Sequence, residues 1–146
     1  MEYKTGSIGR VIVARFDDGD DFLGELQKLI RQEGIKAGWF QVLGGMRRAD
    51  AVSGPREPVM PPDPVWQTVE GAREVLGIGS IFWDGDEPRL HLHSALGHHG
   101  DTLLGCVRKN TLVYLILEVC ILEIKGINAT RPFWDKGGFN RITFGE

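Results

Sequence analysis

Two histidines separated by one residue, His91 and His93, are the side chains of this sequence best suited to bind a metal. The residues around them alternate between apolar and polar, which is typical of a β-strand, and residues two apart in a strand project from the same face. Cys106 follows later in the chain. Two imidazoles and a thiolate match the nitrogen and sulfur ligands that zinc prefers, and a fourth position stays open for water or substrate. The spacing therefore predicts a site for zinc, or for another divalent transition metal, at these three residues; a solvated polar strand face is the alternative.

Several other residues could take part in chemistry. Glu74 precedes a strand-like segment and is a candidate general acid or base, because zinc enzymes pair the metal-bound water with a carboxylate; a structural or interface role is the alternative. His98 and His99 are adjacent and would point apart in an extended chain, so we expect them in a solvated turn. Cys120 lies in an apolar run and is expected to be a core thiol.

Length, composition and charge restrict the class of protein. The chain has 146 residues, of which 42% are hydrophobic, so we expect a single domain over residues 1–146. Acidic side chains outnumber basic ones by 20 to 17, which disfavours direct DNA binding through a basic face. Two cysteines and the lack of a recognisable leader favour a cytoplasmic location. The longest apolar run, residues 112–124, is shorter than the roughly 20 residues that span a bilayer, so no membrane association is expected.

The elements that must position these side chains are mainly strands. Strand-like patterns occur at residues 9–16, 35–42, 46–52, 65–69, 75–83, 89–96 and 110–124. The one clear helix begins near Asp20, with apolar residues at intervals of three and four, and ends at Gly34. Residues 53–64 hold five of the seven prolines and are predicted to form an exposed, irregular loop. The aromatic-rich residues 130–146 are expected to be an ordered tail packed on the body or on a neighbouring subunit.

The order of these motifs resembles the plants-and-prokaryotes conserved domain, the PPC domain, in its short free-standing form. The likeness extends over nearly the whole chain. The segments that carry it are residues 15–22 (RFDDGDDF), Ile35 with residues 42–44 (VLG), residues 74–81 (EVLGIGSI), residues 91–93 (HLH) and the strand from residue 110 to 119. Cys106 stands where members of this family often have histidine, a change that keeps a ligand suited to zinc.

This resemblance implies an α+β fold in which a mostly antiparallel sheet carries one main amphipathic helix and the chains assemble as a homotrimer. Residues 71–76 are similar to a segment that contacts other proteins in plant relatives, which gives Gly71, Arg73 and Glu74 as candidate partner-binding residues. Plant relatives also carry an AT-hook, and no such tripeptide occurs in this sequence. A more distant likeness to acetolactate decarboxylase, a zinc enzyme, leaves catalysis open.

Three functions follow from these observations. The first is a zinc-containing, homotrimeric binding or interaction module, with a small molecule as the possible ligand at the metal. The second is a zinc-dependent lyase or hydrolase that acts on a small molecule, and the third is a regulator that contacts DNA through a partner. A phosphate-binding loop is disfavoured because the glycine pairs lack the lysine and the spacing of such loops.

Overall fold

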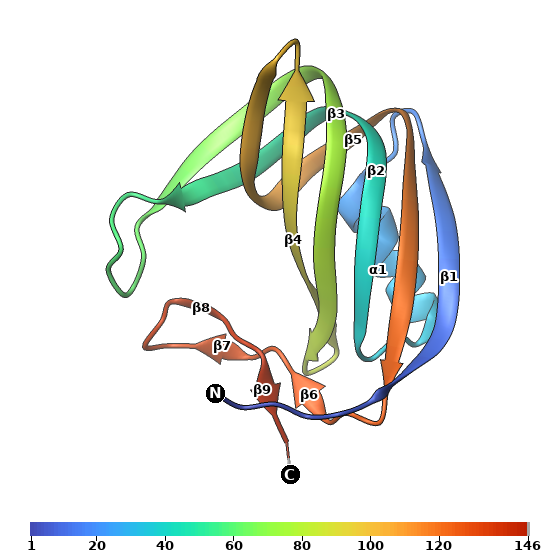
Figure 1. Cartoon of the computed structure of the whole chain (residues 1–146), viewed down its shortest axis with the longest axis vertical. Coiled ribbons are helices and arrows are strands. Elements are labelled where there is room, and N and C mark those ends of the chain that lie inside the picture. Colours follow the sequence, from blue (N-terminus) through green and yellow to red (C-terminus); the bar gives the residue numbers. More distant parts are fainter. Residues whose placement is uncertain (146) are drawn as a thin grey trace.

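The computed structural model describes residues 1–145 and consists mainly of five long antiparallel strands (Figure 1). These strands are β1 (Ser7–Asp17), β2 (Gly38–Pro55), β3 (Pro64–Asp84), β4 (Glu87–His98) and β5 (Asp101–Lys125). Helix α1 (Phe22–Glu33) connects the first two. The predicted fold class, a mostly antiparallel sheet with one main helix, is confirmed.

The strands close on themselves because β5 is long enough to pair twice. Their order in the sheet is β1-β5-β2-β3-β4, and β4 also pairs with the first half of β5. The second half of β5 lies between β1 and β2, while β2 pairs with β5 from Gly38 opposite Glu123 to Val52 opposite Cys106, with register shifts between these two points. Strands β2, β3, β4 and the first half of β5 therefore form a closed ring.

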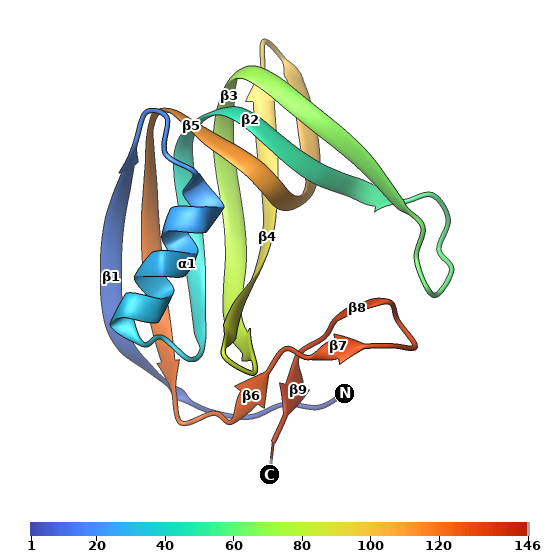
Figure 2. The same ribbon diagram turned by 180° about the vertical axis from the view of Figure 1, so that it is seen from behind.

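Helix α1 covers one face of this sheet (Figure 2). Its apolar side buries Phe22, Leu26 and Ile30 completely against the sheet. Gly34 ends the helix in the left-handed conformation, with φ of 66°, as the sequence predicted. The helix starts at Phe22, with Asp21 at the N-cap position, two residues later than expected. Within residues 1–145, no helix has the length and apolar character that a membrane span needs.

The long strands correct several predicted boundaries. The segments predicted as 35–42 and 46–52 belong to the single strand β2, and 65–69 and 75–83 belong to β3. Register shifts near Gly44 and Met46 show that Gly44 and Gly45 lie at bulges in a continuing strand. Strand β5 also begins at Asp101, well before the predicted residue 110. The proline-rich loop is correspondingly shorter, since β2 reaches Pro55 and β3 begins at Pro64.

The C-terminal segment is ordered, as predicted, and lies across one end of the sheet (Figure 1). It contains the short strands β6 (Ala129–Thr130), β7 (Phe133–Trp134), β8 (Phe139–Asn140) and β9 (Thr143–Phe144). These pair as β6 with β9 and β7 with β8. The backbone N–H of Arg131 donates to the Trp83 carbonyl oxygen at 2.7 Å, which attaches the tail to the end of β3.

A first prediction concerns Gly79, which lies in β3 opposite the fully buried Phe40. A Cβ at Gly79 would overlap the Phe40 ring, so we expect Gly79→Ala to lower the free energy of unfolding by about 1–3 kcal/mol. Gly97→Ala is the matched control, because a Cβ there would make only an ordinary 3.6 Å contact with Thr102 Oγ1. Urea denaturation measures both variants; equal stabilities would contradict the packing described for Gly79.

Candidate metal centre

The three predicted metal ligands meet at one point of the structure. The candidate ligand atoms of His91, His93 and Cys106 all lie within 4.8 Å of one another. The two histidine Nε2 atoms are 3.0 Å apart, and the rings meet edge to face. Strand β4 places both imidazoles on one face, and the neighbouring β5 places Cys106 directly opposite His93.

The hairpin between β4 and β5 sets this pairing. His98 pairs with Asp101, so the turn consists of His99 and Gly100, both with positive φ (48° and 87°). That is the backbone of a type I′ turn, which joins antiparallel strands with a fixed register. Counting back from this two-residue turn brings Cys106 opposite His93.

The donor set fits a tetrahedral transition metal. Zinc bonds of about 2.0–2.3 Å to nitrogen and sulfur require ligand atoms about 3.3–3.7 Å apart. The observed separations, from 3.0 Å between the imidazoles to at most 4.8 Å, bracket this range, so small side-chain rotations would bring all three atoms to a common ion. One thiolate and two imidazoles favour zinc over the harder metals.

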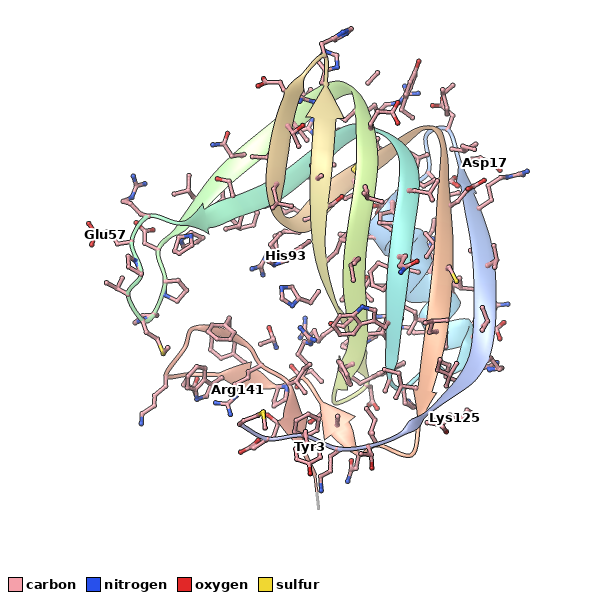
Figure 3. All side chains as sticks on the ribbon, in the orientation of Figure 1. Tyr3, Asp17, Glu57, His93, Lys125 and Arg141 are labelled. Carbon is pink, nitrogen blue, oxygen red and sulfur yellow. The ribbon has the colours of Figure 1, made fainter. Side chains whose placement is uncertain are left out.

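The ligands lie in a cavity of about 840 Å³ between the sheet, the proline-rich loop and the tail. Figure 3 shows His93 projecting from β4 into the space between the sheet and the tail. Cys106 is buried, whereas both histidines are exposed to the cavity. A cavity of this size and accessibility leaves room for a small molecule beside the three ligands.

Two arginines make the surroundings of the ligands positive. Arg131, from the tail, is 5% exposed; its guanidinium donates to Ser80 Oγ at 2.8 Å and lies 5.4 Å from the centre of the Phe82 ring. Arg108 lies on β5, two residues after Cys106, and also lines the cavity. Neither was predicted from sequence. No spacing pattern connects Arg131, in the tail, with the histidines, whereas strand alternation from Cys106 could have indicated Arg108.

Burial and these charges shift the pKa values of the ligands. Partial desolvation at the cavity wall, followed by the positive charge of Arg131, lowers the pKa of His91 from 6.5 to about 4, so its imidazole is neutral at physiological pH and its lone pair is free for a metal. Burial raises the pKa of the Cys106 thiol, against the opposing effects of Arg108 and Arg131. The thiol must therefore lose its proton when a metal binds.

The other candidate residues lie elsewhere. Glu74 pairs with Gly97, whereas Ser80 pairs with His91, so Glu74 is at the far end of the β3–β4 ladder and does not line the cavity. Gly71 and Arg73 lie beyond it, in the same strand. Their predicted role in partner binding stays a prediction.

Two further expectations can be compared with the structure. His98 lies at the end of β4, where its Nδ1 is 2.7 Å from the Ala72 carbonyl oxygen, and His99 is in the turn, as expected. Cys120, expected in the core, is instead half-buried on the face of the sheet opposite to α1, beside Val13 and Gln41. An apolar run does not reveal which of its residues face outward when both faces of the strand are apolar.

Comparison with known proteins assigns the family. Residues 3–125 match the model of the Plants and Prokaryotes Conserved (PCC) domain, and the chain belongs to this family. No curated protein matches the chain.

Solved structures share the fold at low sequence identity. A protein from Archaeoglobus fulgidus described as metal-containing is 21% identical, with a TM-score of 0.84 and complete coverage of both chains. A plant- and prokaryote-conserved protein from Pyrococcus horikoshii is 20% identical, with a TM-score of 0.81, over 100% of this chain and 98% of that one. A protein from Bacteroides thetaiotaomicron described as a putative DNA-binding protein is 15% identical, with a TM-score of 0.78, over 97% and 99% of the two chains.

Proposed function

We propose that this protein is a homotrimeric, zinc-containing binding module whose metal, held by His91, His93 and Cys106, presents an open coordination position to a small ligand. The observation that carries the proposal is the meeting of the three donor atoms within 4.8 Å at the wall of a large cavity. The metal-containing relative from Archaeoglobus fulgidus agrees with it. A zinc ion bound there would supply a Lewis acid at its fourth position.

The surroundings of the three ligands favour binding over zinc-dependent hydrolysis or lyase chemistry. Within residues 1–145, Asp21 is the only acidic side chain that lines the cavity, and its carboxylate accepts a hydrogen bond from Thr111 Oγ1 at 3.0 Å. Asp21 also serves as the N-cap residue of α1. Because zinc hydrolases commonly pair the metal-bound water with a nearby carboxylate, a zinc-dependent enzyme remains the second hypothesis.

The outer face of the sheet, opposite to α1, supports the proposed trimer. It exposes a contiguous set of apolar side chains from four strands: Val13 (79%), Trp39 (45%), Leu43 (51%), Leu76 (70%), Ile78 (51%) and Leu104 (65%). The cross-strand register makes them neighbours, and all of them except Trp39 line a concavity of about 850 Å³ that also includes His93. An exposed apolar surface of this extent is usually an interface, and further copies of the chain are the proposed occupants.

Proton release during metal binding tests the assignment of Cys106. At pH 8, above the ordinary histidine pKa of about 6.5, we expect zinc to displace about one proton per chain, the proton of the Cys106 thiol. The burial that raises the pKa of this thiol keeps it protonated in the metal-free protein. Calorimetric titrations in buffers of different ionisation enthalpy measure the number of protons released.

Cys106→His is the matched variant for this measurement. Its third imidazole retains a nitrogen donor, so we expect it to bind zinc at pH 8 with almost no proton release. Equal proton release by the wild-type protein and the variant would show that Cys106 is not a ligand.

Direct DNA binding is expected to be weak. The pair Arg47 and Arg48, one of two basic clusters in the sequence, is engaged in ion pairs with Asp18 and Glu70. Because affinity for duplex DNA depends on cations that neutralise phosphates, we expect only weak, non-specific binding near 150 mM salt, on the order of 10⁻⁴ M or weaker. A salt titration with random duplex measures it; sub-micromolar affinity with a steep salt dependence would instead favour the regulator hypothesis.

A further inference from the structure

Arg131 is the feature of the cavity that the three metal ligands leave unexplained. Its side chain is 95% buried, yet within residues 1–145 no carboxylate forms an ion pair with it. Among the described residues, the one hydrogen-bond partner of its guanidinium is the neutral Ser80 hydroxyl, and its Nε is buried with no partner. A guanidinium taken out of water normally gains a counter-charge or a full set of hydrogen bonds, because its desolvation is costly.

The position of Arg131 indicates where the missing partner would lie. Arg131 and Arg108 line the same cavity as His91, His93 and Cys106. Of these ligands only the Cys106 thiolate carries a negative charge, and a divalent metal more than cancels it. With both arginines added, the cavity around the metal is strongly positive and lacks an acidic side chain beside the ligands. Residues 1–145 do not supply this partner, and an anion from solution would fit the position.

We propose that the cavity binds a small carboxylate, held by Arg131 and directed to the open position of the metal. This inference rests on the proposed metal site. The planar guanidinium of Arg131 presents N–H donors that match the two oxygens of a carboxylate. Its contacts with Ser80 Oγ and the Phe82 ring fix its orientation before a ligand arrives. Apolar side chains that line the cavity, among them Leu90 and Phe139, fit the remainder of a small organic acid.

Arg131 also connects ligand binding with the tail. The residue lies directly between β6 and β7. Its backbone N–H donates to the Trp83 carbonyl oxygen, and its side chain donates to Ser80, which is three residues before Trp83 in β3. The tail therefore supplies the anion-binding group, and the strands β4 and β5 supply the metal ligands. A carboxylate bound between them would join the two parts, so we expect it to raise the melting temperature of the metal-loaded protein.

The test uses the full chain loaded with cobalt(II), whose visible absorption reports changes at the metal. Sodium acetate, added at constant ionic strength, is expected to change the spectrum saturably, whereas neutral acetamide at the same concentrations is not. Arg131→Gln should weaken acetate binding about 10- to 100-fold, the size expected for a lost charge-assisted hydrogen bond, and keep the metal. Arg141→Gln is the control, because Arg141 lies in the same tail but stacks on Trp134 and does not line the cavity.

The possible outcomes separate this inference from the proposed metal site. Metal content measured before the titration decides the site itself. If cobalt is bound but acetate and acetamide act alike, or if Arg131→Gln binds acetate as tightly as the wild-type protein, the carboxylate proposal is wrong. Tighter binding of inorganic phosphate than of acetate would also overturn it. Arg131→Lys keeps the charge but loses the planar donors, so it should weaken acetate binding about tenfold. This variant replaces Arg131→Gln in the test if the glutamine variant does not fold.

Discussion

Replacing both His91 and His93 with alanine is expected to abolish metal binding, lowering the content from about one ion per chain to nearly none. The two imidazoles lie side by side on β4, and together they supply two of the three donor atoms. The remaining thiol has a raised pKa and is a poor ligand alone at neutral pH. Elemental analysis of protein purified without a nickel column measures the metal content.

The double variant His98→Ala, His99→Ala is the matched control for this experiment. These residues are also paired histidines at the end of the same strand, but they lie outside the cavity. We expect this variant to retain the full metal content. Unchanged metal content in the His91, His93 variant would refute the site.

Placing aspartates at Val13 and Leu76 is expected to convert the proposed trimer into a monomer. Both side chains lie on the outer face of the sheet and are 79% and 70% exposed in the single chain, so their replacement removes no core contact. Burying two carboxylates per chain in an apolar interface would cost several kcal/mol for each one. Sedimentation should therefore give about three times 16.2 kDa for the wild-type chain and 16.2 kDa for the variant.

The control places the same charges on apolar residues outside this face. Val59 and Met60 are 55% and 64% exposed and lie in the proline-rich loop between β2 and β3. Val59→Asp, Met60→Asp should leave the assembly intact. A wild-type protein that sediments as a monomer at micromolar concentration would rule out the trimer.

The metal centre and the proposed interface meet at His93. Its side chain lines both the cavity with the other ligands and the concavity of the outer face, beside Ile78. Copies that cover the outer face would approach the mouth of the metal site. Measuring the metal affinity of the Val13, Leu76 variant would show how far assembly and metal binding depend on each other.

Local patterns in the sequence determined the helix and the pair of histidines. The four-residue spacing of Phe22, Leu26 and Ile30 specifies an amphipathic helix, and Gly34 specifies its end, because both depend only on neighbours along the chain. The alternation around His91 and His93 likewise places both rings on one face. The turn at His99 and Gly100 is also local. Had it been identified in the sequence, the strand register that it sets would have predicted that Cys106 lies opposite His93.

The tertiary structure alone decided which distant residues join or leave the site. Glu74 lies away from the histidines because β3 runs antiparallel to β4, so the register that brings Ser80 to His91 carries Glu74 to Gly97. Arg131 enters the cavity because the tail folds back across the end of the sheet. Register and tail docking depend on contacts between residues far apart in the chain, which no local periodicity encodes. The sequence could therefore indicate the three candidate metal ligands, while the arginines that surround them could be located only in the folded chain.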